Sequence, residues 1–214
     1  RRSPPGTLLG WDVSGDVLKQ AADGSGPAPG TRVVGVMNTG AWAERAAIET
    51  AWMAPLPDNV SYEPAATLPV AGLTALYSLE QAGQLLGRRV LVTGASGGVG
   101  QYGVQLAKLS GASVTALVRR AETVDALLAI GADRVIVEED GKGIIENSPY
   151  HCILDSVGGQ VLAAALNLVA RGGILVNYGI SSGEKATIDA GEFFRTGRSR
   201  YYGLYLFTEF GRRP

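Results

Sequence analysis

A glycine-rich loop between a strand-like and a helix-like segment constrains the fold of this chain more than any other feature. The apolar run Val90–Thr93 is followed by glycines at positions 94, 97, 98 and 100, where a helical pattern begins. Glycine permits the tight turn after the strand and lets backbone N–H groups at a helix start approach a pyrophosphate. The spacing therefore predicts a dinucleotide-binding loop; the alternative is a flexible turn that binds nothing. The residues expected to hold the pyrophosphate are Gly94, Ala95, Ser96, Gly97, Gly98 and Val99.

Strand and helix patterns alternate along the chain that follows the loop. Further strands are expected at Ser113–Val118, Arg134–Val137, His151–Asp155, Ile174–Tyr178 and Arg200–Leu206. Helices are expected at Val99–Ser110, Thr123–Ile130 and Val161–Ala170, with caps at Gly111, Gly131 and Gly172. Strands that are apolar on both faces and alternate with helices form a parallel sheet covered on both sides. We therefore expect an α/β fold with a doubly wound parallel sheet from residue 67 onward.

Residues 1–66 have a different texture. Their apolar runs are short, and Gly, Pro and Ser interrupt them, most densely at Ala22–Gly30 and Pro55–Asp58. Short strands between frequent turns are typical of an irregular, mainly β unit. The sequence thus divides into two expected domains, residues 1–66 and residues 67–214.

The residues after the second strand of the α/β series favour NADP(H) over NAD(H). An Asp or Glu at that point, about 20 residues beyond the loop, would hydrogen-bond the ribose 2′-hydroxyl of NAD. Here Arg119 and Arg120 follow the strand, and the first carboxylate is that of Glu122. Guanidinium groups can bind a 2′-phosphate bidentately. The alternative is a solvated basic turn with no ligand.

Charge and cysteine content exclude several other classes of function. The chain has 19 Lys and Arg against 20 Asp and Glu, so neither nucleic acid nor an anionic membrane is an expected partner. No apolar run is long enough to span a membrane, and the lone Cys152 allows no disulfide within the chain, which suits a cytoplasmic protein. His151 and Cys152 begin a predicted strand, away from the strand ends where ligands bind, so we expect both to be structural.

Several short motifs occur in order along the chain. They are Leu9–Gly15, Pro29–Val33, Gly40–Glu44, Ala66–Ala75, the glycine loop, Gly131–Asp133, Leu154–Gly159 and Val176–Gly179. Together they resemble the medium-chain dehydrogenase/reductases, specifically the zinc-independent quinone oxidoreductase branch of the zeta-crystallin type. The resemblance implies that residues 1–66 are part of a GroES-like β domain and that the rest is a Rossmann domain. Members of that family are longer, so it also implies a chain incomplete at both ends, before Leu9 and after Phe210.

Departures from the zinc-dependent members of that family argue against a metal. Those members carry a Gly-His-Glu segment whose His binds catalytic zinc. The segment of this chain that resembles it reads Gly10-Trp11-Asp12. The region around Val70, similar to the site of another zinc ligand, has no Cys or His. A catalytic zinc needs three protein ligands, and the chain has one His and one Cys in total. No zinc or other metal is therefore expected.

The resemblance also places cofactor contacts at strand ends. The implied groove from adenosine to nicotinamide is lined by Arg119, Arg120, Ser156, Val157, Tyr178, Gly179, Ser181, Leu204 and Leu206. Thr74 resembles the family's threonine near the nicotinamide and is the candidate catalytic residue, as a hydrogen-bond partner of the carboxamide. The alternative is a helix-interior threonine bonded to its own backbone.

The implied activity is an oxidoreductase reaction, the transfer of hydride from NADPH to a small-molecule quinone or α,β-unsaturated carbonyl. Such substrates delocalise the negative charge that develops and need no Lewis acid. Two alternatives stay open: a nicotinamide-binding module with little turnover, and an enoyl reductase domain that acts on acyl thioesters. Family analogy also predicts a homodimer that forms through the last strand.

Overall fold

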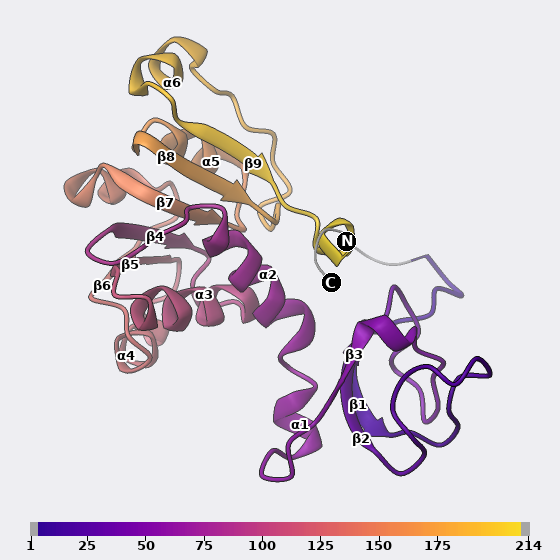
Figure 1. Cartoon of the computed structure of the whole chain (residues 1–214). Coiled ribbons are helices and arrows are strands. Elements are labelled where there is room, and N and C mark those ends of the chain that lie inside the picture. The colour runs from indigo at the N-terminus through magenta and orange to yellow at the C-terminus, as the bar shows by residue number, and fades with distance from the viewer. Residues whose placement is uncertain (1–3, 211–214) are drawn as a thin grey trace. The chain divides into compact units, whose positions relative to one another are not determined.

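The computed structural model describes residues 4–210, and this part of the chain forms two compact units (Figure 1). The first unit holds the chain up to Leu73 together with the segment from Leu206 onward. The second unit holds Thr74–Tyr205, which includes the glycine loop. Every helix within the described residues is too short or too polar to cross a lipid bilayer.

The change from one unit to the other falls inside a helix, α2 (Pro69–Glu80), a few residues beyond the predicted boundary after residue 66. The amino end of α2 is held by Asp12, whose carboxylate accepts a hydrogen bond from the Val70 N–H at 2.6 Å. Burial raises the pKa of Asp12 above its usual value, although this hydrogen bond opposes the shift. The outer ends of the predicted domains, residues 1–3 and 211–214, lie outside the described part.

An antiparallel sheet of three short strands is the centre of the first unit. Across the sheet the strands are β1 (Asp12–Asp16), β2 (Arg32–Val36) and β3 (Met53–Pro55). The remaining elements are η1 (Thr50–Trp52), α1 (Tyr62–Ala65) and α7 (Leu206–Glu209). Trp52 packs against Phe207 and Phe210, with ring centroids 6.4 and 5.3 Å apart, so an aromatic cluster joins the end of the described chain to this unit.

A parallel sheet of six strands is the centre of the second unit. The strands are β4 (Arg89–Thr93), β5 (Ser113–Val118), β6 (Arg134–Val137), β7 (Tyr150–Asp155), β8 (Val169–Asn177) and β9 (Arg200–Gly203). They lie in the order β6-β5-β4-β7-β8-β9, and each neighbouring pair is parallel. The predicted α/β fold class, a Rossmann-type doubly wound sheet with a smaller β part, is confirmed.

Helices cover both faces of this sheet (Figure 1). They are α3 (Gly98–Leu109), η2 (Ala121–Thr123), α4 (Val124–Ala129), η3 (Lys142–Asn147), α5 (Gly159–Leu166) and α6 (Ala190–Thr196). Successive side chains of a strand point to opposite faces, so Val90 and Val92 pack in the core that includes Val104 of α3. Leu91 packs in the other core with Leu162 of α5. This two-sided burial explains the continuous apolar runs in the sequence.

Three predicted elements differ from the structure. The predicted strand Ile174–Tyr178 begins earlier, at Val169, because the irregular start of β8 also pairs with β7. The predicted strand Arg200–Leu206 stops at Gly203, and Leu206 instead begins α7, whose Phe207 packs against Trp52 in the first unit. The predicted helix Val161–Ala170 ends at Leu166, because β8 starts at Val169.

The three predicted helix caps have different outcomes. Gly111 and Gly131 follow α3 and α4 with φ of +78° and +115°, as expected of glycines that end helices. Gly172, with φ of +73°, instead lies in an irregular start of β8, where the register with β7 shifts. The prediction of Gly172 as a helix cap is therefore wrong, since the left-handed backbone serves a strand irregularity here.

Candidate functional site

A cleft of about 550 Å³ opens at the carboxyl ends of the parallel strands. The strand order reverses between β4 and β7, and ligands of open α/β sheets bind at such a switch point. Predicted site residues that line the cleft are Gly94, Ser96, Gly97, Arg119, Arg120, Ser156, Val157 and Ser181. The fold therefore brings together, at one edge of the sheet, residues from four segments that are far apart in sequence.

The glycine loop forms one wall of the cleft, and at two of its glycines the surroundings leave no room for a side chain. Gly94 has a left-handed φ of +59°, and a Cβ there would overlap the Ser156 hydroxyl. A Cβ on Gly100 would lie 2.6 Å from the Gly94 carbonyl oxygen, closer than real contacts allow. The N-cap of α3 is Gly97, which supplies no side-chain cap. The first N–H groups of α3 are therefore available to an anionic ligand.

The ends of β4, β7 and β8 are tied together by the buried carboxylate of Asp155. It accepts hydrogen bonds from the Thr93 hydroxyl at 2.6 Å and from the Asn177 side-chain amide at 2.7 Å. The N–H groups of Val157 and Gly158 also donate to it, at 3.3 and 3.1 Å. Because Asp155 is fully buried, these four donors replace its water shell. The network fixes the cleft wall that follows β7.

The charges in the cleft are mixed. Arg119 and Arg120 follow β5, and Arg120 forms an exposed ion pair with Glu122 at 3.5 Å. Carboxylates from other segments also line the cleft: Glu138, Glu139, Asp140 and Glu184. Asp140 forms an ion pair with Lys142 at 2.6 Å, and the hydrogen bond from that ammonium lowers the pKa of Asp140. A phosphate in this cleft would therefore have to lie close to the arginines to be bound favourably.

Sequence reasoning missed the Asp155 network and the acidic residues of the cleft wall. The signal for the acidic wall was present, because Glu138, Glu139 and Asp140 directly follow a predicted strand. The carboxyl ends of parallel strands meet at one edge of a sheet, so this run was expected at the same edge as Arg119, but its closeness to Arg119 depends on the order of the strands. The signal in the sequence for the Asp155 network was weaker, because it consists of one polar residue at the end of each of three strands. Nothing in the sequence alone shows that these residues meet.

Other predicted site residues lie outside the cleft. Ala95, within the loop, is fully buried, and Gly98 and Val99 form the start of α3. Tyr178, Gly179 and Leu204 line a second, shallower hollow beside the ends of β8 and β9. These residues remain predicted contacts.

Thr74 and Leu206 do not line either hollow. Thr74 is buried in α2, where its carbonyl accepts a hydrogen bond from the Ser78 hydroxyl at 2.7 Å. Leu206 is buried in α7 and belongs to the first unit. The assignment of Leu206 to the end of the sixth strand is wrong, as the chain has left the sheet before it.

His151 and Cys152 lie near the start of β7, remote from the carboxyl ends of the strands. Burial raises the pKa of the Cys152 thiol to about 12, so the thiol stays protonated and is a poor nucleophile. His151 contacts Arg88, its Nε2 atom lying 3.1 Å from the guanidinium. Between residues 4 and 210 no three His, Cys, Asp or Glu side chains are grouped so that they could hold a metal ion.

Comparison with known proteins places the chain in a family. Residues 98–210, more than half of the chain, match the model of the zinc-binding dehydrogenase family. The chain belongs to this family. The structure is similar to a mycobacterial protein complexed with NADPH, with a TM-score of 0.86 and 29% identity over 98% of this chain and 67% of that one. It is also similar to the Escherichia coli quinone oxidoreductase complexed with NADPH, with a TM-score of 0.84 and 30% identity over 96% and 66% of the two chains.

Curated relatives include single enzymes and much larger synthases. The putative quinone oxidoreductase YhfP of Bacillus subtilis is 33% identical over 82% of this chain. The spectinabilin polyketide synthase protein NorB of Streptomyces orinoci is 35% identical over 86% of this chain. This family member spans 57% of the Bacillus protein and 9% of the Streptomyces protein.

Proposed function

We propose that this member of the zinc-binding dehydrogenase family is an NADPH-dependent oxidoreductase that reduces a quinone or an α,β-unsaturated carbonyl. The observation that carries the proposal is the cleft at the switch point, where the glycine loop faces Arg119 across the ends of β4 and β5. Bound NADPH supplies the hydride in such a reaction. The similar Escherichia coli quinone oxidoreductase was solved with NADPH, which supports the same cofactor here.

The residues of the cleft fit the parts of this cofactor. The start of α3 offers uncapped N–H groups to the pyrophosphate, and a Cβ at Gly94 or Gly100 would fill the space that the backbone needs. Arg119 is exposed, and it forms no ion pair within the described residues, so its guanidinium is available to the 2′-phosphate. Tyr178 and Leu204, beside the second hollow, are the proposed neighbours of the nicotinamide. Thr74 remains the proposed partner of its carboxamide.

The chemistry proposed here needs no zinc. A quinone or an enone spreads the incoming negative charge over a conjugated system, so positioning of donor and acceptor is the main task of the protein. Burial and the nearby Asp155 carboxylate raise the pKa of Tyr178 well above its usual value. The Tyr178 phenol, beside the proposed nicotinamide site, thus stays protonated and contributes a dipole to that site but no charge.

A second candidate function is that of an enoyl reductase domain acting on acyl thioesters. It is favoured by the polyketide synthase relatives, which include NorB at 35% identity and a Streptomyces halstedii synthase, also at 35%. An enoyl thioester is itself an α,β-unsaturated carbonyl compound, so the cofactor cleft serves both functions equally. The distinction lies in the acceptor.

Further assignments accompany the proposal. Residues 1–66 are proposed as part of a GroES-like substrate domain and residues 67–214 as the NADP-binding domain. By analogy with the family, we propose a cytoplasmic homodimer with β9 at its interface.

Steady-state oxidation of NADPH with a panel of quinones, enones and enoyl thioesters tests the proposal. We expect turnover on quinones or enones, with NADH a poorer donor. Turnover on thioesters alone would favour the enoyl reductase. Binding of NADPH without turnover on any acceptor would overturn the enzyme assignment in favour of a cofactor-binding module. Elemental analysis of the purified protein tests the metal assignment, and stoichiometric zinc would contradict it.

A further inference from the structure

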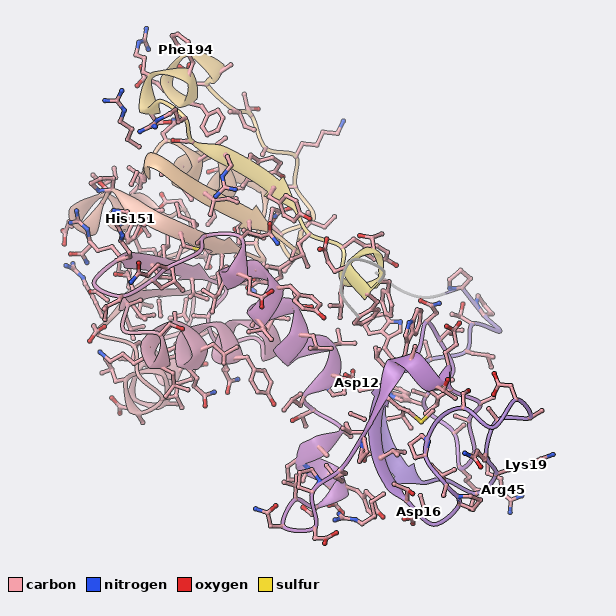
Figure 2. All side chains as sticks on the ribbon, in the orientation of Figure 1. Asp12, Asp16, Lys19, Arg45, His151 and Phe194 are labelled. Carbon is pink, nitrogen blue, oxygen red and sulfur yellow. The ribbon has the colours of Figure 1, made fainter. Side chains whose placement is uncertain are left out.

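A row of arginines follows the edge of the six-stranded sheet at which its strands begin. Because all six strands are parallel, their first residues share this edge, opposite to the cleft. The exposed cations from the starts of β4, β8 and β9 are Arg88, Arg89, Arg171, Arg198 and Arg200. Figure 2 shows His151 of β7 at the same edge. We call this set of five arginines the arginine edge.

The register of the sheet makes the arginine edge continuous. Val90 pairs with Cys152, and Ile174 pairs with both Cys152 and Arg200, so the starts of β4, β7, β8 and β9 are aligned. Adjacent strands lie about 4.8 Å apart, so the four starts span roughly 14 Å. The irregular start of β8 carries Arg171, and the Gly172 N–H bonds the Gly197 carbonyl at 3.1 Å beside Arg198.

The arginine edge carries positive charge that nearby carboxylates do not neutralise. Among residues 4–210 none of its five guanidiniums forms an ion pair, whereas Arg134 at the start of β6 pairs with Glu146. The titratable groups at the start of β7 add no charge. Burial, together with Arg88 and Arg89, lowers the pKa of His151. Burial raises the pKa of Tyr150 and of Cys152, so both stay neutral. Neighbouring arginines of this edge lie within a Debye length of one another, so their charges repel. An anionic partner would remove that repulsion.

Apolar side chains stand beside these charges. Leu86, two residues before Arg88, is 68% exposed, and Leu109 at the end of α3 is 83% exposed. The Gly87 N–H bonds the Gly111 carbonyl at 2.9 Å, which holds the two leucine-bearing segments together. Arginine next to exposed apolar side chains is typical of protein interfaces. Nucleic-acid surfaces are basic more broadly, whereas this chain has a net charge of −1.

We propose that the arginine edge, with Leu86 and Leu109, docks an acidic segment of a partner protein, one that combines carboxylates with apolar side chains. A guanidinium can bind a carboxylate through two parallel hydrogen bonds, and the two leucines supply the apolar contact. The edge lies opposite to the cleft, so docking would leave the cleft open. This inference is independent of the proposed enzymatic function.

Fluorescence anisotropy with a labelled peptide of glutamates interrupted by leucines tests the proposal at moderate salt. The test variant is Arg89→Gln with Arg171→Gln, because within residues 4–210 neither guanidinium forms an ion pair or a hydrogen bond that holds the fold. The matched control is Lys19→Gln with Arg45→Gln, two cations of the first unit that Figure 2 labels. Both variants lose two positive charges.

We expect the intact protein to bind the peptide and the test variant to bind it about tenfold more weakly, with the control changed by less than about twofold. Urea unfolding of both variants shows whether the fold is kept. Equally weakened peptide binding in the two variants would overturn the proposal, since it would show that only the net charge of the protein affects the affinity. Tighter binding to phosphatidylserine vesicles or single-stranded RNA than to the peptide would also overturn it, in favour of another class of partner.

Discussion

Replacement of Asp155 by Asn tests whether a buried carboxylate holds the cleft together. Asn has the same shape, but its amide nitrogen cannot accept hydrogen bonds. With the remaining oxygen facing Thr93 and Val157, the new NH2 group would face two donors, the Gly158 N–H and the Asn177 amide. Asn177 cannot simply rotate, because its amide also donates to the Gly179 carbonyl at 2.7 Å.

The expected cost follows from these two lost bonds. Hydrogen bonds to a charged group contribute about 1.5–3 kcal/mol each, so Asp155→Asn should lower the free energy of unfolding by roughly 3–6 kcal/mol. Most of that loss would persist after relaxation, because Asp155 is fully buried and water cannot reach the unpaired donors. A protein of ordinary stability, about 5–15 kcal/mol, would then be close to unfolding.

Urea unfolding followed by circular dichroism measures this change. The matched control is Thr93→Ser, which keeps the hydroxyl that donates to Asp155 and loses only a methyl group, at a cost of about 1 kcal/mol. If Asp155→Asn is no more destabilising than Thr93→Ser, the carboxylate does not organise the strand ends and the reasoning is refuted.

Three further substitutions probe the cleft and the opposite edge. Gly100→Ala should weaken NADPH binding by about tenfold or more, since overpacking costs about 1–3 kcal/mol. The control Gly15→Ala, which has open space at its Cβ, should leave the affinity unchanged. Equal effects of the two variants would contradict the claim that the loop has no space for a side chain at Gly100. Glu139→Gln should strengthen NADPH binding by about twofold to fivefold, because it removes a negative charge near the 2′-phosphate, and it should leave NADH binding unchanged. An equal gain in affinity for both cofactors would argue against a 2′-phosphate close to Glu139. The fold lowers the pKa of His151, so below about pH 6.5 the unfolded state binds more protons than the folded state and the protein becomes less stable. In urea titrations, His151→Gln should therefore lose less stability than the wild type between about pH 8 and pH 5. An equal loss in the two proteins would refute the assignment.

The sequence was sufficient to predict the parallel sheet and the position of the glycine loop. Both depend on local patterns, namely apolar runs such as Val90–Thr93 and glycines at a strand–helix turn. The positions of Gly111 and Gly131 were predictable for the same reason, because the backbone requirement at a helix end is local. Local patterns failed at Leu206, where an apolar run continued past the strand.

Contacts between distant segments were the part that could not be predicted. The meeting of Thr93, Asp155 and Asn177 depends on the strand order β4-β7-β8, which the sequence does not specify directly. The closeness of Arg119 to the acidic run that begins at Glu138 has the same origin, since β5 and β6 are neighbours. Charges in a cleft are set by topology, whereas helices and strands are set by nearby residues.

Titration calorimetry with NADPH and NADH tests the central claim, that the cleft between the glycine loop and Arg119 is an NADP(H) site. We predict one site per chain in the intact protein, with NADPH bound about tenfold more tightly than NADH, which corresponds to one well-placed phosphate contact. Arg119→Ala should remove most of that difference and leave NADH affinity unchanged. Equal affinity for the two cofactors in the intact protein, or no binding of either, would contradict the claim.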